Sequence, residues 1–263
     1  MKVVILAGGL GSRISEESHL QPKPMIEVGD KPILWHVMKG YAHFGFTDFV
    51  ICAGYKQHMI KEWFSDYFLH SSDVTFDYTG GSLVTEVHDT RVEPWRVTVT
   101  DTGFFTNTAG RILRTKRYIG DETFMLTYGD GVSDVDPNDI LAAHNASGMT
   151  VTLTGVTMNQ RFGVMDVDKN GRIRTFREKH PVDSAMINGG FMVCNPRVYD
   201  VIEQSCEDPD ATDFSGVTLE WMASHGELGC YHHDGFWACM DTQRDHRMLE
   251  KMWREGNAPW KVW

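Results

Sequence analysis

The chain has 263 residues, of which 41% are apolar and 23% are charged, and its formal net charge is −11 at pH 7. This length and composition are typical of one large globular domain and exclude a disordered chain or a fibrous repeat. The negative charge excludes a general nucleic-acid binder, because such a protein needs a positive field against phosphates. The apolar runs are far shorter than the ~20 residues that span a bilayer, and a strand-like run begins directly after Lys2. We therefore expect no membrane partner, no signal peptide and a cytoplasmic location.

Apolar runs alternate with helix-like patterns along the first part of the chain. The runs predict strands at Val3–Ala7, Phe49–Cys52, Phe124–Tyr128 and Thr150–Val156. Apolar residues at helical spacing predict helices at Ile33–Ala42, His58–Phe68 and Pro137–Ser147, the last with Asp136 as its N-cap. Strands that alternate with helices predict right-handed crossovers and a mostly parallel sheet with helices on both faces.

The pattern changes in the later part of the chain. Residues 163–176 alternate around Lys169-Asn170-Gly171, which predicts a hairpin. Further predicted elements are a helix at Leu219–Glu227, a strand at Gly235–Met240 and a closing helix at Gln243–Glu255. We expect one domain over residues 1–263, a three-layer α/β fold with a mixed, mainly parallel twisted sheet. Its C-terminal helix and tail, about residues 243–263, carry tryptophans that should pack on the domain or on a neighbouring subunit.

A glycine-rich turn, Gly8-Gly9-Leu10-Gly11, follows the first predicted strand. Such a turn is a common phosphate- or nucleotide-binding element, because glycine lets the backbone approach the ligand. Two known patterns fail: the dinucleotide fingerprint would need its third glycine at Ile14, and the P-loop counted from Gly8 fails at Arg13. Arg13 and Lys23 flank the turn and would suit a triphosphate. The alternative is a tight turn with two solvated cations.

Two aspartates, Asp130 and Asp241, each follow a predicted apolar strand. Ligands bind at the carboxyl edge of open α/β sheets, and two carboxylates that converge there suit Mg²⁺. The alternative is a turn or a helix N-cap, and Asp241 could cap the helix near Gln243. For Asp134 and Asp136 we expect a solvated turn and an N-cap, because the calcium-loop spacing is missing.

The glycine turn and the segment around Lys23 closely resemble a known signature. Leu6–Arg13 followed by Pro22–Met25 resembles the loop of the sugar-1-phosphate nucleotidylyltransferases. The resemblance covers nearly the whole chain. It also includes Gly29–His36, Arg91–Trp95, Thr127–Gly131, Met186–Phe191, Gly235–Trp237 and Ala258–Lys261.

The resemblance implies a Rossmann-like nucleotidyltransferase fold, Mg²⁺ as cofactor, and a homo-oligomer such as a hexamer. Among the members of this family, the chain looks like those that use CTP and α-D-glucose 1-phosphate. The resemblance makes Arg13 and Lys23 catalytic and Asp130 and Asp241 metal ligands. It assigns the nucleotide to Leu6, Ala7, Gly8, Gly9, Gly11, Ser12, Arg111 and Gly129, and the sugar phosphate to Glu178, Lys179, Asn188 and Gly189.

Base selection is the role that the resemblance implies for Arg111. An arginine fork can donate to the two acceptors of cytosine, O2 and N3, whereas uracil presents a donor at N3. The alternative is an arginine on the surface of a helix, beside Arg114 and Arg117. For Glu178 and Lys179, the alternative is an ordinary surface pair.

Two departures from the family pattern concern the sugar side. His180 stands where proline usually follows the Glu-Lys pair, and Val217-Thr218 replaces an expected Glu-Pro pair. They leave open the same chemistry on another sugar phosphate, a phosphonate or another nucleotide. A nucleotide-binding subunit without catalysis is disfavoured, because Arg13, Lys23, Asp130 and Asp241 are all retained.

Overall fold

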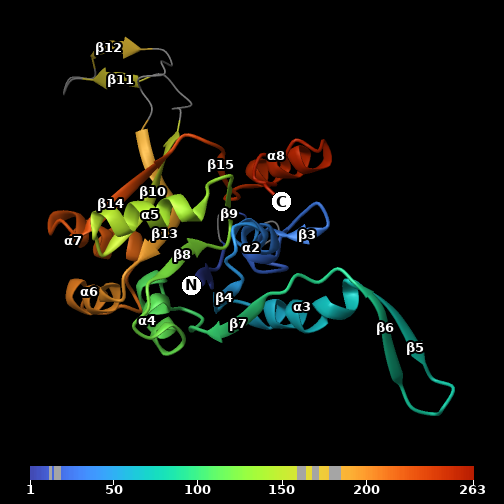
Figure 1. Cartoon of the computed structure of the whole chain (residues 1–263). Coiled ribbons are helices and arrows are strands. Elements are labelled where there is room, and N and C mark those ends of the chain that lie inside the picture. The colour runs from blue at the N-terminus through green and yellow to red at the C-terminus, as the bar shows by residue number, and fades with distance from the viewer. Residues whose placement is uncertain (12–13, 15–18, 159–163, 168–171, 178–184) are drawn as a thin grey trace.

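The computed structural model describes the whole chain except residues 12–13, 15–18, 159–163, 168–171 and 178–184. Its centre is a twisted seven-stranded sheet with the strand order β14-β10-β13-β8-β1-β4-β7 (Figure 1). The strands, in chain order, are β1 (Lys2–Ala7), β4 (Asp48–Ala53), β7 (Arg96–Asp101), β8 (Phe124–Tyr128), β10 (Val151–Met158), β13 (Ala185–Cys194) and β14 (Leu228–His233).

The sheet is mixed but mainly parallel. Among its described strands, β13 alone runs antiparallel to its neighbours, β10 and β8, and the other neighbouring pairs are parallel. The predicted sheet is therefore confirmed, and the four strands predicted from the first part of the chain lie within two residues of their observed bounds. The sequence patterns do not reveal β7, in which threonines alternate with valines, or β13, which Gly189 and Gly190 interrupt.

Helices cover both faces of the sheet. Successive residues of each strand point to opposite faces, so one strand contributes apolar side chains to the core on either side. Val3 and Ile5 pack in one apolar core, and Val4 and Leu6 pack in the other. The first core includes residues of α2 (Ile33–His43), α3 (Gln57–His70), α5 (Pro137–Ser147) and α8 (Gln243–Arg254), and the second includes residues of α4 (Thr108–Ile119), α6 (Arg197–Ser205) and α7 (Leu219–Ser224). This is the three-layer α/β arrangement that the sequence predicts.

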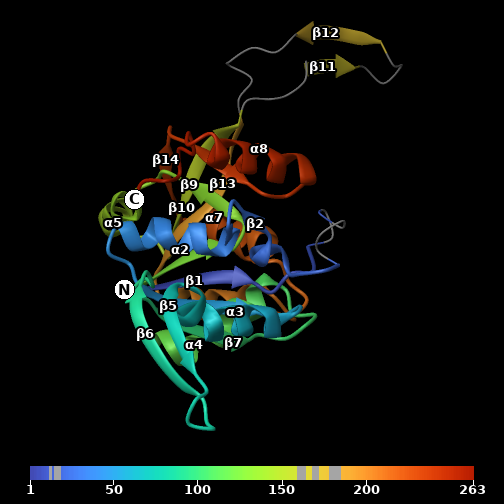
Figure 2. The same cartoon turned by 90° about the vertical axis from the view of Figure 1, so that its right-hand side faces the viewer.

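Several antiparallel pairs lie outside the main sheet. The hairpin of β5 (Ser72–Asp77) and β6 (Val84–Thr90) projects far from it (Figure 1). Figure 2 shows that β11 (Val164–Val167) and β12 (Ile173–Arg177) also lie outside the sheet; they form the predicted hairpin, whose turn at 169–171 lies outside the described residues. Two shorter pairs are β2 (Glu27–Val28) with β3 (Lys31–Pro32), and β9 (Gly131–Ser133) with β15 (Trp237–Cys239).

The N-termini of α5 and α8 show which residues cap these two helices. Asp136 caps α5 by accepting a hydrogen bond from Asn138 N–H at 2.8 Å, as predicted. Thr242 caps α8 in a capping box with Asp245, so the alternative that Asp241 caps this helix is wrong.

The C-terminal tail packs on the first core of its own chain. Trp260 is fully buried, and its indole N–H donates to Nδ1 of His36 at 3.4 Å. His36 Nε2 donates to Val28 O at 2.8 Å, so both ring nitrogens have partners in the neutral form. Burial lowers the pKa of His36 to about 4. Within the described part of the chain, no helix combines the length and the hydropathy that a membrane span requires.

Candidate active site

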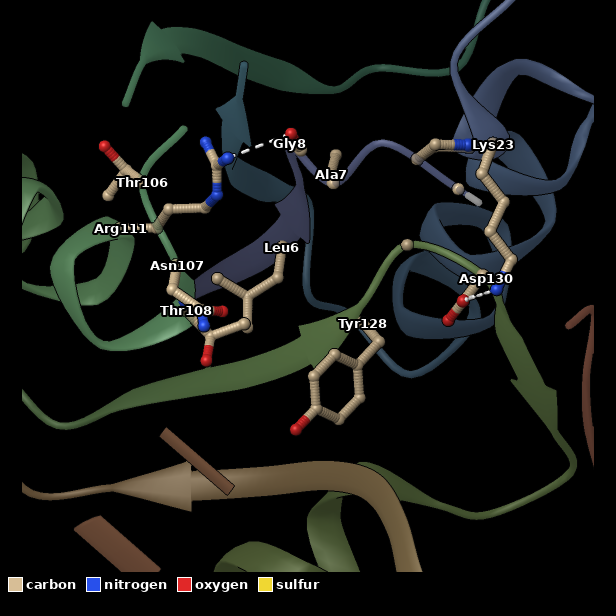
Figure 3. A pocket seen from close by; sticks show the side chains of 14 residues that line it. Leu6, Ala7, Gly8, Lys23, Thr106, Asn107, Thr108, Arg111, Tyr128 and Asp130 are labelled. Carbon is tan, nitrogen blue, oxygen red and sulfur yellow. Dashed lines mark hydrogen bonds and ion pairs between the residues drawn. The ribbon is translucent and has the colours of Figure 1, made fainter. Parts of the chain in front are cut away.

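The glycine-rich turn follows β1 at the carboxyl edge of the sheet (Figure 3). Gly8 O accepts hydrogen bonds from Tyr55 N–H at 3.2 Å and from Arg111 Nη2 at 2.9 Å. A Cβ atom on Gly8 would lie only 2.2 Å from Arg111 Nη1. Glycine is therefore required here for close packing of the turn against the arginine.

A cavity of about 240 Å³ lies between this turn, the end of β8 and the start of α4. It brings together most of the residues that the sequence assigns to the nucleotide, with the lysine and one of the two aspartates. These lining residues are Leu6, Ala7, Gly8, Gly9, Gly11, Lys23, Arg111, Gly129 and Asp130. Ser12 and Arg13, which the sequence places with them, lie outside the described residues.

The N-terminus of α4 also lines this cavity, and the sequence analysis missed it. Thr106, Asn107 and Thr108 belong to the lining, and Asn107 is the N-cap of the helix. The N–H groups of its first turn already have partners: Thr108 N–H donates to Asn107 Oδ1, Ala109 N–H to Thr212 O and Gly110 N–H to Pro209 O. The signal that could have found it is Asn107 before Thr108, a favourable N-cap ahead of a helical pattern.

Arg111 lies on α4 and is buried, so the alternative of an arginine on the helix surface is wrong. Its Nη1 donates to Thr102 Oγ1 at 2.7 Å and to Gly103 O at 2.8 Å, and its Nη2 donates to Gly8 O. Burial lowers the pKa of the guanidinium from its ordinary value, but arginine stays charged in proteins. The result is a fixed cation in the wall of the cavity.

Asp130 and Asp241 lie together, although they are far apart in the sequence. Asp130 follows β8 and Asp241 follows β15, and Lys23 Nζ contacts Asp130 and lies 2.5 Å from Asp241 Oδ1. Burial lowers the pKa of Lys23, but the two carboxylates outweigh this effect and hold the pKa above its ordinary value. Figure 3 shows the Lys23 side chain meeting Asp130 at the edge of the cavity.

The carboxylate pair fits a divalent cation. One oxygen of Asp130, one of Asp241 and the sulfur of Cys239 all lie within 4.8 Å of one another. Carboxylate oxygens are the ligands that hard cations prefer. The Lys23 ammonium already contacts both carboxylates, which shows that both can reach one positive charge. The residues therefore fit a metal ion shared by Asp130 and Asp241.

A second cavity, of about 250 Å³, adjoins the first at Asp130 and also contains Asp241. Asn188 and Gly189 of β13 line it, as the sequence assigns them to the sugar side. Trp237 also lines it and was not predicted; its indole N–H donates to Gly189 O at 2.7 Å. The two cavities therefore share Tyr128 and Asp130, and Asp241 lines the second of them.

The other sugar-side residues are placed differently. Glu178, Lys179 and His180 lie outside the described residues. Val217 is 46% exposed in the π-helical turn η4 (Phe214–Thr218). The same turn contacts the site through Ser215, whose hydroxyl lies 2.5 Å from that of Tyr128 in the cavity wall.

This fold and site define a class: a nucleotide-binding α/β transferase, with a glycine turn, a lysine and two carboxylates at one edge of a mixed sheet. The chain belongs to the nucleotidyl transferase family, whose model matches residues 2–250. It is therefore a nucleotidyltransferase, and the resemblance found in the sequence is confirmed.

Two individual relatives are similar to the chain over its full length. The chain is 51% identical over 264 residues to the glucose-1-phosphate cytidylyltransferase of Salmonella typhimurium, with 100% of both chains covered. It is 41% identical over 263 residues to a probable glucose-1-phosphate cytidylyltransferase of Bacillus subtilis, again over 100% of both.

Solved structures support the fold. HddC from Yersinia pseudotuberculosis superposes with a TM-score of 0.67 at 20% identity and covers 96% of this chain and 99% of its own. A putative glucose-1-phosphate thymidylyltransferase from Bacillus anthracis gives a TM-score of 0.67 at 20% identity, over 97% of this chain and 96% of its own.

Proposed function

We propose that the protein transfers the cytidylyl group of CTP to α-D-glucose 1-phosphate and releases pyrophosphate, with CDP-glucose as the second product. One observation carries this proposal: the cavity of the glycine turn and the cavity of Asn188 and Gly189 adjoin at Asp130, and Asp241 lines the second of them. A nucleotide in the first cavity and a sugar phosphate in the second would bring their phosphates together there. The names of the full-length relatives support this choice of substrates.

The transfer is a direct in-line displacement. A phosphate oxygen of glucose 1-phosphate forms a bond to the α-phosphorus of CTP while the bond from that phosphorus to the pyrophosphate oxygen breaks. No covalent intermediate with the protein is required, because positioning and charge neutralisation account for catalysis of this kind. The glycine turn binds the triphosphate through backbone N–H groups.

Lys23 and Arg13 neutralise charge that develops on the phosphates. Lys23 is held at the meeting point of the two cavities by Asp130 and Asp241. Mg²⁺, held by these same carboxylates, would supply a Lewis acid for the phosphate oxygens. The reacting phosphates are thus surrounded by cations on the side where negative charge grows.

Arg111 selects the base. Among the described residues, its hydrogen bonds involve Nη1 and Nη2, so the Nε–H and one Nη2–H remain for a ligand. A guanidinium with fixed orientation can donate to both O2 and N3 of cytosine. Uracil and thymine bear a proton at N3, so this arrangement disfavours them.

The protein acts as a cytoplasmic homo-oligomer in this proposal. The β5–β6 hairpin supports an oligomer, because Phe76, Tyr78, Leu83 and Val84 expose 48–67% of their surfaces on an element that projects from the sheet. Exposed apolar groups that cluster in this way commonly mark protein contacts. Light scattering of the purified protein measures the subunit number.

Pyrophosphate release tests the reaction. CTP, UTP, dTTP, ATP and GTP are each paired with several sugar 1-phosphates at saturating Mg²⁺, and we expect strong release only with CTP and glucose 1-phosphate. CTP with another acceptor would retain the mechanism and trace the substrate to the departures at His180 and Val217. CTP binding without pyrophosphate release from any pair would refute the proposal.

A further inference from the structure

A short two-stranded sheet links the two carboxylates. β9 begins directly after Asp130, and β15 ends two residues before Asp241. The two strands pair antiparallel, with Gly131 opposite Cys239, and Met240 N–H donates to Asp130 O at 2.9 Å. The separation of the two carboxylates therefore depends on the register of this pair.

The pair needs support at its other end, because each strand has only three residues and isolated two-stranded pairs are marginally stable. Asp134 lies at this end, directly after β9. Its Oδ1 accepts hydrogen bonds from Phe236 N–H and from His233 Nε2, both at 2.8 Å. We call Asp134, His233 and Phe236 the clamp.

Two further contacts fix the same end. Ser133 Oγ donates to Phe236 O at 2.7 Å and Asp134 N–H donates to the same oxygen at 3.2 Å, so both backbone polar groups of Phe236 are held by the last residue of β9 and the residue after it. The side chain of His233 is 11% exposed and that of Asp134 is 32% exposed. The expectation that Asp134 is merely a solvated turn residue is therefore wrong.

Gly235 lies inside the clamp. A Cβ atom at this position would lie 2.5 Å from Asp134 Oδ1 and 2.6 Å from His233 Cε1. The clamp can close only because residue 235 has no side chain. A methyl group there would separate Asp134 from His233 without removing either residue.

We propose that Asp134 is a positioning residue for the transfer reaction. By holding His233 and Phe236, it fixes the register of β9 against β15 and thereby the distance between Asp130 and Asp241. This inference rests on the proposed function, in which those two aspartates hold the metal ion. Asp134 lies outside the lining of the two cavities that adjoin at Asp130, so it acts through the two carboxylates.

Manganese binding tests the clamp without the transfer reaction. Mn²⁺ is titrated into the protein with CTP and no sugar phosphate, and free Mn²⁺ is measured by electron paramagnetic resonance. We expect Asp134→Ala to bind Mn²⁺ about 10-fold more weakly, the lower limit for losing a partner that orients a metal ligand. Asp134→Asn should stay close to wild type, because its amide oxygen can accept both hydrogen bonds.

Asp136→Ala is the matched control, because Asp136 lies two residues further on and caps α5. It should lower stability through the lost N-cap and leave Mn²⁺ affinity unchanged. Gly235→Ala is the second test and should weaken Mn²⁺ binding as Asp134→Ala does.

Two outcomes would overturn the clamp. In one, folded Asp134→Ala and Gly235→Ala bind Mn²⁺ as tightly as wild type. In the other, Asp136→Ala weakens binding as much as they do, so that lost stability explains the effect. The proposed function fails separately, if wild-type protein makes no CDP-glucose whatever the variants bind.

Discussion

Replacing Lys23 with methionine removes the cation at the meeting point of the two cavities and keeps most of its apolar stem. The ammonium contacts Asp130 and lies 2.5 Å from Asp241, and only 12% of the Lys23 side chain is exposed. A preorganised charged group of this kind contributes about 10²- to 10³-fold to turnover, or about 2.7–4 kcal/mol. We therefore expect kcat for pyrophosphate release to fall by about that factor.

The same substitution leaves two neighbouring carboxylates without their counter-ion, so divalent-cation affinity should rise while turnover falls. Turnover is measured at saturating CTP and Mg²⁺, and affinity is measured with Mn²⁺ as the probe. Lys39→Met is the control, because Lys39 pairs with Glu93 at 2.7 Å and its loss changes the net charge equally. Wild-type turnover in Lys23→Met, or an equal loss in Lys39→Met, would refute the reasoning.

Three other substitutions have defined outcomes. Gly8→Ala places Cβ 2.2 Å from Arg111 Nη1 and should displace the guanidinium. We expect the kcat/KM preference for CTP over UTP to fall by about 1–3 kcal/mol, the value of one bidentate base contact. Gly9→Ala, where Cβ meets no atom within 4 Å, should reduce this preference less. Trp260→Ala should cost about 3–5 kcal/mol in urea unfolding, because it empties a fully buried site, and the same loss from Trp263→Ala would contradict this. Because the pKa of His36 is lowered to about 4, the contribution of neutral His36 to the free energy of unfolding is fully present above pH 6.5. This contribution is lost as the pH falls toward 4, by up to about 3 kcal/mol. An equal decline in His36→Gln would exclude His36 as the cause.

The sequence predicts those parts of the fold that leave a local pattern. Strands β1, β4 and β8 are continuous apolar runs because both of their faces are buried, and their neighbours in the sheet follow from β-α-β connections. Helix α4 leaves a weaker pattern, because charged residues separate its buried positions. The β5–β6 hairpin leaves almost none, because most of its residues are exposed and neither face has to be apolar.

The residues of the candidate site differ in the same way, because only some of them leave a local sequence pattern. The glycine turn and Asp130 lie next to recognisable strands, so their positions at the sheet edge follow from local pattern. Lys23 lies in the 3-10 turn η2 (Lys23–Met25), and the resemblance rather than a strand pattern assigns it to the site. The roles of Asp134 and His233 depend on a contact between residues 99 positions apart in the sequence. Single-residue patterns carry no information about such a contact, so only the tertiary structure reveals it.

The direction of β13 explains why local sequence patterns, without the family resemblance, do not reveal the sugar side. In a parallel strand, site residues lie just beyond the carboxyl end, as Gly8 does after β1 and Asp130 after β8. The antiparallel strand β13 has Met192 opposite Leu126, so Asn188 falls beyond the end of β8, beside Asp130. Gly190, with a φ of +83°, gives the Tyr128 ring room at this crossing. Asn188 and Gly189 therefore lie inside a strand rather than after it, so local pattern alone does not place them at the site, and the family resemblance supplies their assignment.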